Sequence, residues 1–162
     1  MSNIFDKTFE IVKSQNLKVV DKDTDRPWGG FFVISEDDAQ DFSNIYFNGL
    51  NIEELKVSGK LSPKILIIAP NKRLSWQYHH RRSEIWKVVG DQIKVVTSHD
   101  DIERKEQILK EGDEIRLSRG ERHRIIGMDE YAIVAEIWIH TDKINPSDEN
   151  DIVRVQDDFD RN

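Results

Sequence analysis

The sequence predicts a mostly β domain, either a β-sandwich or a small barrel, on the evidence of its length and of the pattern after Pro63. Short apolar runs of about five to ten residues recur there between turn-forming residues, and they are rich in β-branched side chains. This regular spacing favours an all-β fold over βαβ units. The 162 residues suffice for one domain with a sizeable core. The runs are KILIIAP, LSWQYH, EIWKVVG, QIKVVTS, DEIRLS, HRIIG and YAIVAEIWIH.

The chain before Pro63 is expected to carry the helical content. Three apolar residues recur at intervals of three to four, which predicts a short amphipathic helix over residues 2–15, capped by Ser2 or Asn3. They are Phe5, Phe9 and Val12. The run DKDTDRPWGG is polar and rich in turn formers, and FFVIS after it predicts a strand. Residues 36–62 mix helix starts with breakers, so we expect an excursion with one short helix.

Charge and composition narrow the classes of function. The chain has 31 acidic and 24 basic residues, a net charge of −7, which argues against binding to nucleic acid or to an anionic membrane surface. No window approaches the roughly 20 apolar residues of a membrane span, and the N-terminus lacks the features of a signal peptide, so a cytoplasmic location is expected. Because there is no cysteine, a bound metal must be held by imidazole, carboxylate or amide groups.

Ligand-type side chains gather in the stretch LSWQYHHRRSEIWKVVG, which begins at Leu74. On a β-strand Gln77 and His79 point to one side, and His80 points to the other and is not expected to be a ligand. Glu84 can face the same spot as His79 if the polar HRRS segment turns the chain. Close pairs of His and Glu are more often surface decoration, so spacing elsewhere in the chain must support a metal site.

A second region, EGDEIRLSRGERH, supplies that support. Glycines at 112 and 120 flank a predicted strand, and a turn at Gly120 can return His123 to the first cluster. Two imidazoles, one carboxylate and one amide oxygen suit Zn²⁺ and tolerate Mn²⁺, Fe²⁺, Co²⁺ or Ni²⁺.

The two regions resemble the two sequence motifs of the cupin superfamily, with Gln77 in place of the first motif's initial histidine. Within cupins, the sequence most closely resembles the type II mannose-6-phosphate isomerases. The matching segments are RPWG from Arg26, LSWQYHHRRSEIW, GERHR and ENDIVRVQDDFDR. This resemblance implies an all-β cupin jelly-roll barrel over residues 26–162, with residues 1–25 as a helical extension. It also makes the acidic C-terminal segment part of the active site, although its composition alone suggests a loosely docked tail.

The resemblance further implies that Gln77, His79, Glu84 and His123 bind a divalent metal, usually zinc, inside the barrel. The implied reaction interconverts mannose 6-phosphate and fructose 6-phosphate. The segment HTDKINPSDEN is longer than the corresponding link in that family, so heptose and pentose phosphates stay open as substrates. A sugar-binding cupin without catalytic activity is the main alternative, and another metal-dependent cupin enzyme such as a dioxygenase is a weaker one. Cupin barrels often pair through strands, so we expect a homodimer.

Four further residues are candidates for catalysis or substrate binding. Glu136 interrupts an apolar strand in phase with Val134 and Trp138, which suits a desolvated general base, although a structural ion pair with an arginine explains it equally well. Arg154 matches the geometry of a phosphate or an enediolate, the alternative being a salt bridge to neighbouring acids. Further candidates for binding the phosphate, which as lone cations are more often solvated, are Lys64 and Arg26.

Overall fold

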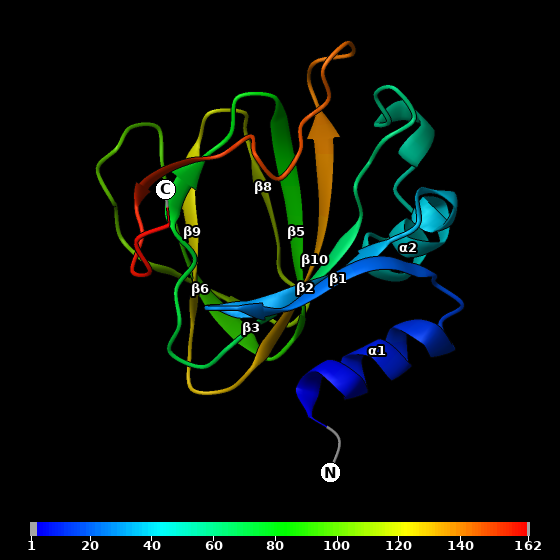
Figure 1. Cartoon of the computed structure of the whole chain (residues 1–162), viewed down its shortest axis with the longest axis horizontal. Helices are drawn as coiled ribbons and strands as arrows, with labels where there is room; N and C mark the ends of the chain where they lie inside the picture. The colour runs from blue at the N-terminus through cyan, green and yellow to red at the C-terminus, as the bar shows by residue number, and fades with distance from the viewer. Residues whose placement is uncertain (1–2, 162) are drawn as a thin grey trace.

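Two antiparallel sheets face each other and enclose the interior of a barrel (Figure 1). The structure is a computed structural model that describes residues 3–161. The larger sheet contains, in spatial order, β1 (Val19–Arg26), β2 (Gly29–Ile34), β3 (Lys64–Ile68), β10 (Ala132–His140), β5 (Arg82–Gly90) and β8 (Glu114–Leu117). The smaller sheet contains β11 (Val153–Gln156), β4 (Trp76–Tyr78), β9 (Arg122–Gly127), β6 (Gln92–Ser98) and β7 (Gln107–Lys110). The predicted all-β barrel is therefore confirmed.

Helices cover the outside of the larger sheet. They are α1 (Ile4–Ser14) and α2 (Ala39–Tyr46), with single 3-10 turns at Glu36–Asp38 and Ile52–Glu54. The N-terminal helix is confirmed with Asn3 as its cap, because the Asn3 side chain accepts a hydrogen bond of 2.9 Å from the Asp6 N–H. Ser2, the other predicted cap, lies outside the described residues. In Figure 1, α1 lies along β1 and β2.

Strand alternation divides the core into two layers. Along β3, Ile65 and Ile67 face the helices, and Leu66 and Ile68 face the barrel interior. The same alternation in β10 sends one set of side chains toward the helices and the other into the barrel. Lys64 and Glu136 are Cα partners across β3 and β10, and both are in phase with the interior residues. Two charged residues therefore belong to the inner layer of the larger sheet.

Three strands lie in polar segments that were not predicted to form strands. The run DKDTDRPWGG, predicted to form turns, contains most of β1, which pairs with β2. β1 has a solvated outer side at the sheet edge, so it lacks the apolar alternation that marks a strand in sequence. β7 is a second unpredicted edge strand, and β11 shows that the C-terminal segment is docked by a ladder to β4. The predicted division of the chain into an extension, residues 1–25, and a domain, residues 26–162, stays a prediction. β1 spans the residues on both sides of that division.

Among the described residues, no helix is long and apolar enough to cross a membrane.

Candidate metal centre and its cavity

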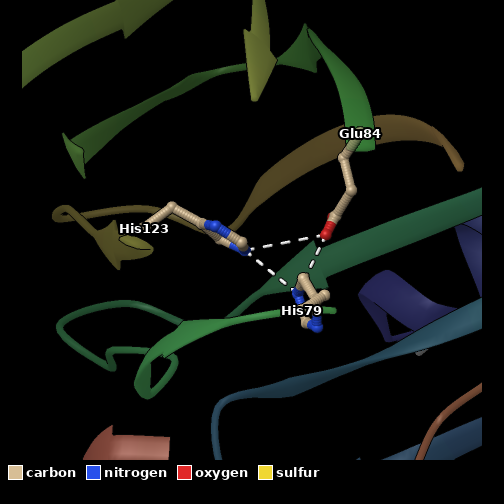
Figure 2. A group of neighbouring side chains, drawn as sticks. All are labelled: His79, Glu84 and His123. Atoms are coloured by element: carbon tan, nitrogen blue, oxygen red, sulfur yellow. Dashed lines mark hydrogen bonds and ion pairs between the residues drawn. The ribbon is translucent and has the colours of Figure 1, made fainter. Parts of the chain in front are cut away.

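Three buried side chains meet at one point inside the barrel (Figure 2). The His79 Nε2 atom lies 3.0 Å from Glu84 Oε2 and 3.2 Å from His123 Nε2, and His123 Nε2 lies 3.6 Å from Glu84 Oε2. Each of the three side chains is at most 3% exposed. One oxygen and two nitrogens therefore converge where little water reaches them.

The local backbone explains why residues distant in sequence converge here. β4 ends at Tyr78 and β5 begins at Arg82, so the intervening turn moves the chain to the other sheet and points Glu84 back at His79. Gly120 adopts a φ of 78°, which favours glycine, and its N–H donates to the His79 carbonyl at 3.0 Å. This bond fixes the entry to β9, which carries His123. The predicted turns at HRRS and Gly120 are thus where the sequence placed them.

Hydrogen bonds orient both imidazoles for metal binding. His79 Nδ1 donates to the Asp151 carbonyl at 2.7 Å, and His123 Nδ1 donates to the Glu121 carbonyl at 2.9 Å. Because Nδ1 carries the proton in each ring, the Nε2 lone pairs point into the cluster. Burial lowers the pKa of His123 to about 4, so this imidazole is neutral at neutral pH. A neutral ring is the form that binds a metal ion.

Gln77 lies beside the cluster as a fourth candidate ligand. Its amide is 3.4 Å from His79 Nε2, and its other end accepts a hydrogen bond of 2.5 Å from the Ser75 hydroxyl. The oxygen and nitrogen of an amide are assigned by their surroundings. With the amide turned over, its oxygen faces the cluster and its NH₂ group donates to Ser75, so Gln77 can act as an oxygen ligand.

The donor set fits a divalent metal ion. Ligand atoms held at about 2.0–2.2 Å from one tetrahedral ion are roughly 3.3 Å apart, close to the separations in this cluster. Imidazole and carboxylate donors accommodate Zn²⁺ and also Mn²⁺, Fe²⁺, Co²⁺ and Ni²⁺, so the chemistry of the set does not select one of them. The buried cluster of His79, Glu84 and His123 can therefore hold a metal ion of this group.

A cavity of about 400 Å³ opens beside the cluster. Five of its lining residues are basic and three are acidic, an excess of positive charge inside a protein whose net charge is −7. The basic residues are Arg26, Lys64, Arg82, Arg154 and Arg161, and the acidic residues are Glu84, Glu136 and Glu149. The composition of this lining favours an anionic ligand.

Glu136 and Glu84 share one hydrogen-bond donor. The Trp86 indole N–H lies 3.0 Å from an oxygen of each carboxylate. Burial and the neighbouring Glu84 charge raise the pKa of Glu136 well above its ordinary value. For Glu84, burial opposes ionisation, but its charged and hydrogen-bonding neighbours, foremost Arg82, outweigh burial and hold the pKa well below the ordinary value. The two carboxyl groups therefore have opposite tendencies, and the one beside the imidazoles is the one that is ionised.

The C-terminal segment packs against the site and forms part of its wall. Besides its carbonyl bond to His79, Asp151 accepts backbone N–H groups of His80 and Arg81 at 2.9 Å and the Ser147 hydroxyl at 2.6 Å. Arg154 follows on β11 as the Cα partner of Gln77. This segment, residues 147–156, is thus built into the wall of the site.

All eight predicted site residues lie at this one place. His79 and His123 form the cluster with Glu84, and the other five line the cavity. The five are Arg26, Lys64, Gln77, Glu136 and Arg154. Their roles stay predictions. The alternative for each of Glu136 and Arg154 was a structural ion pair. Neither residue forms an ion pair with any described residue.

The contact of Arg82 with the cluster was not predicted from the sequence. From the sequence, Arg82 either steers an anionic substrate or lies in an exposed turn. In the structure it is 6% exposed and contacts Glu84 at 3.4 Å and Ser147 at 2.9 Å, so it is not part of an exposed turn. Its guanidinium lies 3.6 Å from the centroid of the Trp138 ring. A signal was present, since Arg82 and Glu84 are two apart on one strand and share a face. His80, which was not expected to be a ligand, is exposed and is not a member of the cluster.

The fold and the site define the protein as a cupin. Solved structures with the same fold include vicilin from Corylus avellana, with a TM-score of 0.57, 14% identity, and coverage of 86% of this chain and 36% of that chain. Another is CapF with an inhibitor, with a TM-score of 0.56, 15% identity, and coverage of 86% and 34%. Oxalate decarboxylase from Bacillus subtilis gives a TM-score of 0.54, 16% identity, and coverage of 78% and 28%. The chain therefore spans about a third of the length of these proteins.

The family described as mannose-6-phosphate isomerase C-terminal matches residues 36–157. Because this match covers more than half of the 162 residues, the chain belongs to that family. A search of curated proteins found no match.

Proposed function

We propose that the protein is a metal-dependent sugar-phosphate isomerase that interconverts an aldose and a ketose, with mannose 6-phosphate and fructose 6-phosphate as the expected pair. The observation that carries the proposal is the placement of a buried carboxyl group, Glu136, next to a metal-ligand cluster in a cationic cavity. Membership of the family supports the same reaction.

The chemistry needs a group that moves a proton between adjacent carbons. Glu136 would take the proton from C2 of the open-chain aldose while the carbonyl oxygen at C1 gains a proton, which leaves a neutral enediol. The same carboxyl would then deliver a proton to C1 as the C2 hydroxyl loses its proton and becomes the ketone. A carboxyl whose pKa is raised by burial is suited to accept and return a proton. Trp86 would hold it in place through its N–H.

Negative charge builds up on the sugar oxygens during this transfer. A metal ion bound by His79, Glu84, His123 and Gln77 would supply Lewis-acid stabilisation of that charge. Of the chain's own groups, Arg82 and Arg154 lie on the cavity wall and would stabilise oxyanions by charge-assisted hydrogen bonds. Lys64 and Arg26 would bind the phosphate group. Arg154 Nε is buried and has no hydrogen-bond partner among the described residues, so it is free to donate to a ligand.

The test is turnover of mannose 6-phosphate by the zinc-loaded protein and by two variants. Glu136→Gln should keep its zinc and lose activity by about 10²- to 10⁴-fold, because it removes the base but no metal ligand. His79→Ala should lose both zinc and activity. If the wild-type protein binds sugar phosphates but converts none of them, the function is binding alone. Full activity in Glu136→Gln would contradict the assignment of the base.

A further inference from the structure

Lys64 is a buried cation whose ion-pair partner has an exposed side chain. Its side chain is 6% exposed, and its ammonium group forms an ion pair with Glu149, whose side chain is 54% exposed. Both residues line the cavity. A buried ammonium group needs a counter-charge. The ion-pair partner that supplies this charge, Glu149, lies on the connection between β10 and β11.

The surroundings of Lys64 fix the ammonium group but leave its partner replaceable. The ammonium lies 3.7 Å from the centroid of the Trp138 ring and 5.2 Å from that of Phe31, so two aromatic rings hold it in the cavity. Glu149 has no such support, since among the described residues its carboxylate bonds to Lys64 alone. The backbone beside it is anchored through Asp151, so the Glu149 side chain can leave while the connection stays docked.

We propose that Glu149 is a specificity-determining residue that occupies the position of the ligand's phosphate and must be displaced from Lys64 by it. This inference rests on the proposed function and adds a rule for ligand choice. A phosphate group carries more negative charge than a carboxylate and can replace it at the ammonium. A neutral sugar cannot, because binding it in this position would leave the buried Lys64 ammonium without its ion-pair partner.

The test compares the affinities of zinc-loaded wild-type protein and Glu149→Gln for three probes, measured by calorimetry. The probes are inorganic phosphate, mannose 6-phosphate and mannose. Removing the competing carboxylate should strengthen binding of both phosphate-bearing probes by about tenfold, and the preference for mannose 6-phosphate over mannose should widen equally. Added phosphate should also raise the Tm of Glu149→Gln more than that of the wild type, because phosphate restores the missing counter-charge.

Asp142→Asn is the matched control. It removes one negative charge from a half-buried position in the same connection, away from the cavity lining, and should change the affinities by less than twofold. In a Lys64→Met background, Glu149→Gln should have no effect on phosphate affinity. Unchanged or weaker phosphate binding in Glu149→Gln, or no binding in either protein, would overturn the proposal. Because binding is measured without turnover, a failed isomerase assay leaves this test intact.

Discussion

At the scale of single residues, one indole N–H connects two buried carboxyl groups of the site. Trp86 donates to Glu84, a predicted metal ligand, and to Glu136, the predicted base. The spacing of Gln77, His79 and Glu84 was readable from the sequence because strand alternation is a local property. The bridge by Trp86 was not, since it joins two strands that are distant in the sequence.

Trp86→Phe should therefore lower the free energy of unfolding by about 2 to 4 kcal/mol, because it removes one hydrogen bond from each of two buried carboxyl groups and leaves a small cavity. Trp76→Phe is the control: the Trp76 N–H donates to a neutral backbone carbonyl, that of Asp101, at 2.8 Å, so the loss should be smaller. Urea unfolding of the metal-free proteins measures the loss of free energy of unfolding in each variant. Equal losses would show that the bridge adds no stability.

At the scale of elements, the segment of residues 147–156 forms one wall of the cavity and contacts the metal-ligand cluster through His79. Composition indicated a loose tail, and only the family resemblance placed this segment at the site. The reason is physical: its docking depends on backbone ladder bonds to β4 and on the Asp151 contacts, neither of which leaves an apolar pattern in the sequence. β1 and β7 escaped prediction for the related reason that edge strands carry polar residues.

Asp151→Ala should weaken zinc binding by about 10- to 100-fold, because the carbonyl that fixes the His79 ring loses the contacts that hold it in place. Asp142→Ala, in the same connection, caps a turn that touches no ligand and should leave zinc affinity unchanged. Competition with a chelating dye reads the affinity without any enzyme assay. If both variants bind zinc as tightly as the wild type, Asp151 does not help to position His79 for metal binding.

At the scale of the whole molecule, buried polar groups make stability depend on pH. Burial lowers the pKa of His140 to about 4, and its ring accepts the Ser147 N–H and contacts the Ser62 hydroxyl at 3.0 Å. The unfolded chain binds this proton below pH of about 6.5, whereas the folded protein does not bind it until about 4. The stabilisation is therefore complete above about pH 6.5 and is lost as the pH falls toward 4.

His140→Gln can keep both hydrogen bonds but cannot titrate. Its free energy of unfolding should fall by about 2 kcal/mol less than that of the wild type between pH 7 and pH 5, since one pKa unit corresponds to about 1.4 kcal/mol. Urea unfolding at the two pH values provides the comparison. An identical pH dependence in the two proteins would mean that His140 is not the group responsible.

The whole chain also explains how an acidic protein can take an anionic ligand. The lining of its cavity has more basic than acidic residues, and this cavity lies beside the cluster that can hold a metal ion. That arrangement is a property of the fold and cannot be read from the net charge of −7. The expected homodimer stays a prediction, which light scattering of the purified protein can test.

The most direct measurement is a proton NMR time course of mannose 6-phosphate in D₂O with the zinc-loaded protein. Isomerisation through an enediol predicts the appearance of fructose 6-phosphate together with loss of the C2 proton signal from the remaining mannose 6-phosphate, because the carboxyl of Glu136 exchanges its proton with solvent. Neither change should occur with His79→Ala. A C2 signal that persists in the wild-type reaction, with no ketose formed, would contradict the isomerase account.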